Sequence, residues 1–145
     1  MKNEFKMKWY DFLWEGLQTL LGCIVLLFLK EKKDGGLYKG RRVIYFKKGS
    51  FFSATSLGYW ILIPKGSKDR TKAHEWGHCM QSKKSGPLYL PICGVPSLRN
   101  NLKARKCKRT KENYYDLHPE KEADELGGVK WVDGVRVHVE NGKVV

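Results

Sequence analysis

Two histidines flank a glutamate in the segment His74-Glu75-Trp76-Gly77-His78. Residues four apart lie on the same face of a helix, so the ring nitrogens of His74 and His78 can bind one metal ion. Glu75 is rotated from that face by about one helical step, which lets its carboxylate reach a metal-bound water without being a ligand. Zinc lowers the pKa of such a water toward about 7, and a nearby glutamate can take the proton. The spacing therefore predicts a hydrolytic metal centre, whereas the plainer interpretation is two surface histidines on an amphipathic helix.

A third ligand is expected because a catalytic zinc ion takes three protein ligands and keeps one position open. The segment 119–128 begins with proline and ends with two glycines, which is typical of a short helix. Within it, Glu120 and Asp124 share a face, so Glu120 can bind zinc while Asp124 orients a histidine ring. Glu122 and Glu125 fall on other faces. The alternative is an ordinary acidic first turn that matches the helix dipole.

The two motifs together, His74-Glu75-Trp76-Gly77-His78 and Glu120-x-x-Ala123-Asp124, resemble the gluzincin branch of the zinc metallopeptidases. The spacing of the second motif is similar to that of the CAAX-prenyl and HtpX-type membrane proteases. The resemblance covers residues 55–129, and the metzincin pattern is absent because Lys84 stands where its third histidine would be. The flanking sequence resembles small zincin-like proteins of bacteria and their phages in Gln81-Ser82, Gly86-Pro87-Leu88-Tyr89-Leu90, Gly94-x-Pro96-Ser97 and Leu126-Gly127-Gly128.

By this resemblance, the protein is a zinc metalloendopeptidase that hydrolyses peptide bonds in a peptide or protein substrate. The resemblance implies Zn²⁺ as the cofactor, with His74, His78 and Glu120 as its ligands. It further implies that Glu75 is the general base and that Asp124 supports a histidine ligand.

The expected fold class is α+β, in the form of a minimal zincin-like domain that occupies residues 1–145. It comprises an N-terminal apolar backing helix (1–33), a catalytic core (34–128) and a C-terminal β-hairpin (129–145). The core is expected to contain a small β-sheet, the active-site helix and the third-ligand helix. Local patterns predict one helix over 8–30, strands over 37–47, 51–55 and 57–63, a helix over 71–84 and an ordered loop over 87–97. Turns are predicted at Gly35-Gly36 after the first helix, and at Asp133-Gly134 and Asn141-Gly142 in the hairpin.

Two further features of a peptidase site are predicted. An edge strand above the metal pairs with an extended substrate backbone, and Gly58, Tyr59 and Trp60 are the candidates, although an interior strand fits the same pattern. A histidine or tyrosine donor helps zinc to hold the negative charge of the transition state. The candidates for this donor are His118, Tyr114 and Tyr115, which precede Glu120.

The composition is that of a folded basic domain. The chain has 145 residues, 41% of them hydrophobic, with a formal net charge of +13. This apolar fraction excludes a disordered, charge-extended chain and supports one packed core. The four cysteines form no C-x-x-C pair, so no zinc ribbon or thioredoxin-like motif is present. We therefore expect reduced thiols, a monomer and a cytoplasmic location.

The apolar helix expected at residues 9–29 could pack against the protein or lie in a membrane. Residues 16–29, which are apolar except for Gln18 and Thr19, are too few for a typical membrane span and are more typical of a packed core helix. Polar or small residues recur on one stripe, at Asp11, Glu15, Gln18 and Gly22, which a helix immersed in lipid does not need. The pattern therefore favours a packed helix, with a membrane-associated or membrane-spanning helix as the alternative.

A basic loop is expected at residues 99–111, where seven of thirteen residues are lysine or arginine. It could contact nucleic-acid phosphates or anionic headgroups, or it could be a solvated loop between the two metal-binding helices. Two alternative functions follow: a nucleic-acid-binding protein with a structural zinc, and a membrane-anchored, non-catalytic zincin-like interaction protein. An intact Glu75 favours the peptidase, because a structural zinc site needs no general base.

Overall fold

The computed structural model describes residues 8–50, 52–107 and 114–145 of the chain. It is a mixed α+β structure, as the sequence predicts. A four-stranded sheet comprises β1 (Lys33–Tyr38), β2 (Arg41–Phe46), β3 (Thr55–Leu57) and β4 (Trp60–Pro64). The strand order is β1-β2-β4-β3, in which β2 and β4 are parallel and the other two pairs are antiparallel.

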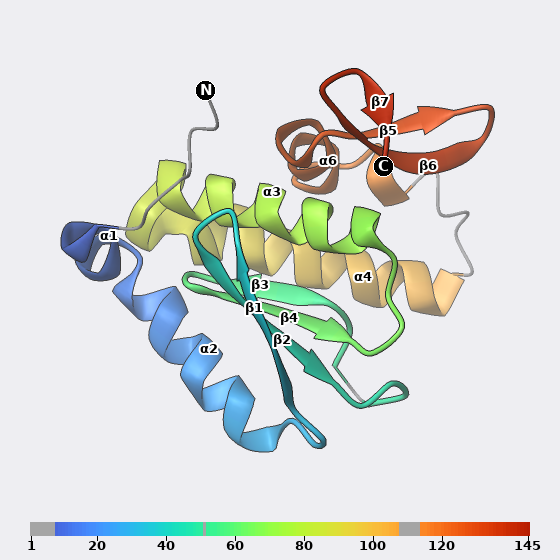
Figure 1. Cartoon of the computed structure of the whole chain (residues 1–145). Coiled ribbons are helices and arrows are strands. Elements are labelled where there is room, and N and C mark those ends of the chain that lie inside the picture. The colour runs from blue at the N-terminus through green and yellow to red at the C-terminus, as the bar shows by residue number, and fades with distance from the viewer. Residues whose placement is uncertain (1–7, 51, 108–113) are drawn as a thin grey trace.

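Helices cover both faces of this sheet (Figure 1). The long helix α3 (Asp69–Ser85) lies on one face, where Cys79 packs against Ile61 and Ile63 of β4. The helix α2 (Gly16–Phe28) lies on the opposite face, and Leu62 of β4 contributes to the cluster on that side. Alternate residues of one strand point to opposite faces, so the apolar run of β4 fills both layers of the core.

The N-terminal segment forms two helices, so the prediction of one helix over 8–30 is wrong. The helix α1 (Trp9–Trp14) ends at Glu15, and α2 begins at Gly16, which has a low helix propensity. The predicted stripe is confirmed, because Asp11, Glu15, Gln18 and Gly22 are all buried against the rest of the protein. Among the described residues, no helix is long and apolar enough to cross a membrane.

The strand positions also differ from those predicted. The turn expected at Gly35-Gly36 lies within β1, and the actual turn to β2 follows Tyr38. The segment 57–63 contains a second turn, at Gly58 and Tyr59, between β3 and β4. Gly58 has φ of 57°, and a Cβ there would lie 2.2 Å from Oγ1 of Thr19, so only glycine fits. Only Thr55 of the strand predicted at 51–55 is in β3; residue 51 lies outside the described residues.

The segments expected as a proline-containing loop and a basic loop are largely helical, so both predictions are wrong. They form a 3₁₀ turn (Gly86–Leu88), a π-helical turn (Leu90–Gly94) and the helix α4 (Val95–Cys107). The three prolines occupy the first or second position of these elements, where the missing N–H breaks no helical hydrogen bond. The basic residues 108–111 lie outside the described residues.

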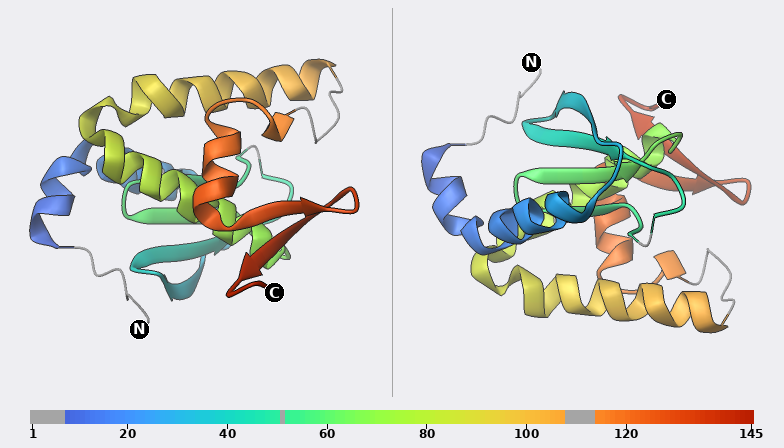
Figure 2. Two further views of the ribbon diagram at one scale, coloured as in Figure 1. Left: turned by 90° about the horizontal axis from the view of Figure 1, so that it is seen from above. Right: turned by 90° about the horizontal axis from the view of Figure 1, so that it is seen from below.

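The C-terminal part follows the predicted order. The helix α6 (Glu120–Gly127) ends at Gly128, which has the left-handed conformation. The strands β5 (Val129–Val132), β6 (Val135–Glu140) and β7 (Lys143–Val144) form an antiparallel meander with turns at the two predicted Asx-Gly pairs. Seen from above, α6 crosses α3, and the meander lies at one end of that crossing (Figure 2).

A buried polar network joins α1 and α2 to α3. The Arg41 guanidinium donates a hydrogen bond of 2.9 Å to the Glu15 carboxylate, and both side chains are fully buried. The Ser82 hydroxyl donates to the other carboxylate oxygen of Glu15. The amide of Gln18 donates to Ser82 and to the backbone oxygen of Gly86. The polar stripe of the N-terminal helices therefore holds the C-terminal half of α3 in place.

The first prediction concerns this network. Arg41→Met is expected to lower the free energy of unfolding by about 3–5 kcal/mol, because it leaves the Glu15 carboxylate buried without its charged partner. Urea denaturation measures this loss. The double variant Glu15→Gln/Arg41→Met is expected to recover part of it, since no unpaired charge remains. A loss below about 1 kcal/mol in Arg41→Met would contradict the buried pair.

Candidate metal centre

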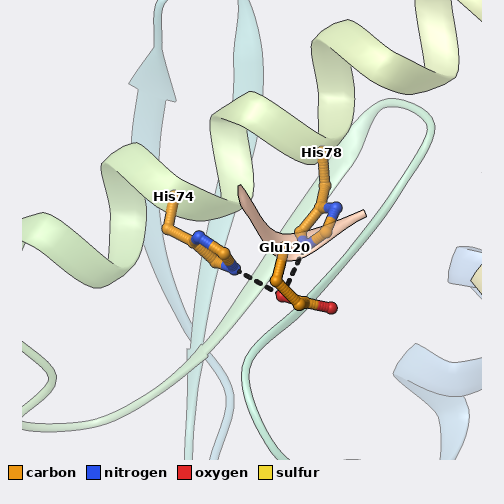
Figure 3. A group of neighbouring side chains, drawn as sticks. All are labelled: His74, His78 and Glu120. Atoms are coloured by element: carbon orange, nitrogen blue, oxygen red, sulfur yellow. Dashed lines mark hydrogen bonds and ion pairs between the residues drawn. The ribbon is translucent and has the colours of Figure 1, made fainter. Parts of the chain in front are cut away.

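The side chains of His74 and His78 leave α3 on one face and meet Glu120 from the start of α6 (Figure 3). Nε2 of His74 lies 3.1 Å from Oε2 of Glu120, and Nε2 of His78 lies 3.3 Å from the same oxygen. All three side chains are buried. One ligand atom from each lies within 4.8 Å of the others, which is the spacing that one metal ion needs. The structure therefore brings together the three residues that the sequence predicts as ligands.

Two glycines allow α6 to approach α3 closely enough for this meeting. A Cβ at Gly77 would lie 1.9 Å from the backbone oxygen of Ala123, and one at Gly127 would lie 2.2 Å from that of Ala73. No side chain fits at either place without moving a helix backbone. Gly77 is the residue between Trp76 and His78 of the motif, so the same segment supplies both the ligands and the close approach.

The outer nitrogen of each histidine is held by a hydrogen-bond acceptor. Nδ1 of His74 lies 2.6 Å from Oδ1 of Asp124, and Nδ1 of His78 lies 2.8 Å from Oε1 of Gln81. The Gln81 amide nitrogen donates to the Pro119 backbone oxygen and to Glu122, so its oxygen is the atom that faces His78. Both Nδ1 atoms must therefore donate, which leaves a lone pair on each Nε2.

When both rings are neutral, three acceptor atoms therefore converge with no donor among them. Two Nε2 lone pairs face one carboxylate oxygen, an arrangement that repels unless a proton or a cation lies between them. The second oxygen of Glu120 accepts a hydrogen bond from the Ser97 hydroxyl. Two imidazoles and one carboxylate with oriented outer atoms form a donor set that zinc prefers. The types and orientation of these three side chains are therefore suited to binding a zinc ion.

The charge state of the ligands agrees with this fit. Burial alone would lower the pKa of His74, but the carboxylates of Asp124 and Glu120 outweigh it and raise the pKa to about 9. Burial alone would raise the pKa of Glu120, but the two histidines hold it well below its usual value. A proton and a divalent cation therefore compete for the same three atoms.

Glu75 follows His74 in α3 and lies beside the three candidate ligands without being one of the group that converges. Its side chain is buried, and burial raises the pKa of its carboxylate above the usual range. Its Oε2 atom has no hydrogen-bond partner within the described residues. Glu75 also lines the same cleft as the two histidines and Glu120. A buried carboxylate with a free oxygen and a raised pKa is suited to accepting and returning a proton.

Arg136 is a site residue that the sequence did not predict. It extends from β6, donates two hydrogen bonds to Asp124, and lies 3.4 Å from the centre of the Tyr115 ring. Burial would raise the pKa of Asp124, but the hydrogen bonds with His74 and Arg136 keep it below its usual value. Polar residues occupy the buried positions of β6 and valines the outer ones, which is opposite to the usual pattern of a hairpin. Ser97 and Gln81 were missed as partners of the ligands as well.

The three predicted transition-state donors have different surroundings. Tyr114 and Tyr115 both line the cleft, whereas His118 is exposed and is not among the residues that line it. Tyr115 packs edge-to-face on the His74 ring at 5.4 Å between centroids. Burial, and then the Glu120 carboxylate, raise the pKa of Tyr114 well above its usual value, so its hydroxyl stays protonated. Of the three candidates, Tyr114 and Tyr115 therefore lie at the cleft and His118 does not.

The predicted substrate strand lies elsewhere in the sheet. Gly58 and Tyr59 are in a turn, and Trp60 begins β4, which has a neighbour on each side. The edge strand next to the metal ligands is β3, and residues 53–57 line the cleft. Gly58, Tyr59 and Trp60 therefore do not form an edge strand, and the edge strand at the cleft is the segment just before them. The cleft has a volume of about 490 Å³ and also includes Leu90 and Leu98.

Comparisons with known proteins identify no relative. No protein-family model matches the chain, and no curated protein or solved structure matches it significantly. The resemblance carried by the two motifs therefore stays a hypothesis, and inferences about the site rest on its own chemistry.

The helix crossing leads to a second prediction. Gly77→Ala is expected to abolish stoichiometric zinc binding, because its Cβ would displace α6 and carry Glu120 away from the histidines. Zinc content after dialysis, measured by mass spectrometry, tests this. Gly16→Ala is the matched control, since a Cβ there has no atom within 4 Å, and it should bind zinc normally. Normal zinc binding by Gly77→Ala would contradict the role of the crossing.

The orientation of His74 leads to a third prediction. Asp124→Asn is expected to weaken zinc binding about 10- to 100-fold, because it removes the carboxylate that fixes Nδ1 of His74 as the donor. Competition with a chelating indicator measures the affinity, and circular dichroism checks that the variant is folded. Glu125→Gln, an exposed change on the same helix, should leave the affinity unchanged. If both variants bind equally well, Asp124 does not orient the ligand.

Proposed function

We propose that this protein is a zinc-dependent peptidase of zincin-like architecture. The observation that carries the proposal is the convergence of His74, His78 and Glu120 beside the buried carboxylate of Glu75. The order of elements supports it: backing helices, a small sheet, the helix with both histidines, and the helix with the third ligand. Three protein ligands leave a position for water, as in catalytic zinc sites.

Each residue has a distinct role in the proposed hydrolysis. When bound, zinc would lower the pKa of a water molecule and polarise the substrate carbonyl group. Glu75 takes a proton from the attacking water and passes it to the amine nitrogen that leaves as the peptide bond breaks. The raised pKa of Glu75 favours the first transfer, because its carboxylate binds the proton more readily than an exposed glutamate does. Asp124 and Gln81 keep the histidine rings in position.

Tyr114 is proposed as the donor to the developing oxyanion. Its hydroxyl remains protonated because burial and the Glu120 carboxylate raise its pKa, and it lines the cleft with Glu75. A fixed donor in a site of low polarity stabilises developing charge more than one in water does. Substrate binding is assigned to β3, the edge strand of the cleft, by addition of an extended backbone to the sheet.

The donor set disfavours a purely structural zinc. Structural sites are closed by four protein ligands, mostly cysteine and histidine. Among the described residues, the group that converges here supplies three, and one of them is a carboxylate. The basic surface of α4 contributes no aromatic side chain on which nucleic-acid bases could stack. A peptidase is therefore preferred to a nucleic-acid-binding protein with a structural metal.

The fourth prediction separates metal binding from catalysis. The wild-type protein is expected to bind about one zinc per chain and to cleave an unstructured protein such as casein. Glu75→Gln should keep the zinc and lose cleavage, because an amide cannot take the proton from water. His74→Ala should lose the zinc. Glu125→Gln, which changes an exposed glutamate, should keep both.

Two results would contradict the proposal. Full cleavage by Glu75→Gln would exclude this glutamate as the general base. Full zinc content in His74→Ala would place the metal elsewhere in the protein. Urea denaturation of each variant shows whether a loss of activity is only a loss of folding.

A further inference from the structure

The N-terminal helices have an inverted distribution of side chains. Their polar residues face the protein, whereas nearly all of their large apolar residues face outward. The exposed fraction is 75% for Trp9, 60% for Leu20 and 78% for Leu27. The exposed apolar residues of α1 and α2 are Trp9, Tyr10, Phe12, Leu13, Trp14, Leu17, Leu20, Leu21, Ile24, Leu27 and Phe28. So many exposed large apolar side chains on two successive helices, rare on monomeric proteins that stay in water, mark an interaction surface.

A second apolar stripe lies on the segment 86–107. Leu88, Ile92, Val95, Leu98 and Leu102 are all exposed. This stripe adjoins the first, because the Trp14 indole of α1 donates a hydrogen bond to the backbone oxygen of Lys83, just before this segment. Leu21 of α2 and Leu98 of α4 also line the same cleft, from its two sides. We call these two stripes together the apolar surface.

Most of the charged side chains around the apolar surface are positive, and the exposed Glu31 next to Lys30 is paired with Lys47 and Lys65. Lys8 and Lys30 lie at the ends of the N-terminal helices, and both are exposed. On α4 the exposed cations are Arg99, Lys103, Arg105 and Lys106. The segments 8–30 and 86–107 contain two acidic residues, Asp11 and Glu15, and both are buried. The apolar surface therefore presents tryptophan, tyrosine and leucine with a cationic border, the composition of segments that bind at an anionic membrane interface.

We infer that the apolar surface docks on an anionic lipid bilayer and lies at its interface. The charge distribution favours this partner over a second copy of the chain, since two copies would bring the same cations together at a net charge of +13 each. Anionic headgroups neutralise those cations, and acyl chains accept the leucines. The helices α1 and α2 have 6 and 13 residues and lie on the surface of the bilayer with their apolar residues in it. The cleft then opens beside the membrane.

Flotation of the full-length protein with vesicles tests this inference. The vesicles are phosphatidylcholine alone or phosphatidylcholine with about one third phosphatidylglycerol. The wild-type protein is expected to float with the anionic vesicles and less with the neutral ones. Leu20→Glu should weaken binding at least about tenfold, because it places a charge on the buried side of the interface. Val144→Glu is the matched control, since Val144 is 63% exposed on β7, outside the apolar surface, and this variant should float normally.

Three results would overturn the inference. The first is failure of the wild-type protein to float with either kind of vesicle. The second is equal binding by Leu20→Glu and Val144→Glu. The third is a stable dimer that light scattering detects without lipid and that Leu20→Glu converts to a monomer, which would assign the apolar surface to self-association. Glu75→Gln should float normally, so membrane docking and the proposed peptidase activity can fail independently.

Discussion

The close crossing of α3 and α6 is the constraint on which the site depends. Glu120 reaches both histidines because the backbones of the two helices touch, with Gly77 against Ala123 and Gly127 against Ala73. Any side chain at either glycine would push the two backbones apart and so lengthen the 3.1 Å and 3.3 Å distances between the histidine nitrogens and Oε2 of Glu120. The backbone packing thus sets the distance, and the ligands sit at positions where that distance suits one metal ion.

Hydrogen bonds then fix the orientation of the two histidine rings. Asp124 and Gln81 hold the outer nitrogens of the histidines, and Arg136 in turn holds Asp124. At the other end of α3, Glu15, Gln18 and Arg41 hold Ser82 and the following turn. These polar groups are buried because the N-terminal helices turn their polar stripe inward. Because the polar side of these helices faces the protein, their leucines and tryptophans face outward. The same orientation of the N-terminal helices therefore holds α3 in place and creates the inferred membrane surface.

Local sequence patterns predicted the residues of the candidate site more accurately than they predicted the strands of the sheet. The ligand set, the two helices that carry it and the C-terminal hairpin follow from helical spacing and from glycine, proline and Asx-Gly signals, which act over a few residues. The edge position of β3 depends on pairing between distant strands, and no local pattern encodes it. The helix over 95–107 was missed because Pro96 and the two prolines before it are typical of a loop, although each lies at the start of a helical segment. Arg136 was missed because its partner, Asp124, lies on another element, and its role depends on how the meander packs against α6.

The central claim is that one zinc ion is held by two histidines and a glutamate. X-ray absorption at the zinc edge of the zinc-loaded protein tests it most directly. Zinc bound to His74, His78 and Glu120 should show four nitrogen or oxygen ligands at about 2.0–2.2 Å, with the outer-shell scattering of two imidazole rings. A sulfur ligand at about 2.3 Å, or the scattering of fewer than two imidazoles, would place the metal on other residues and exclude this site.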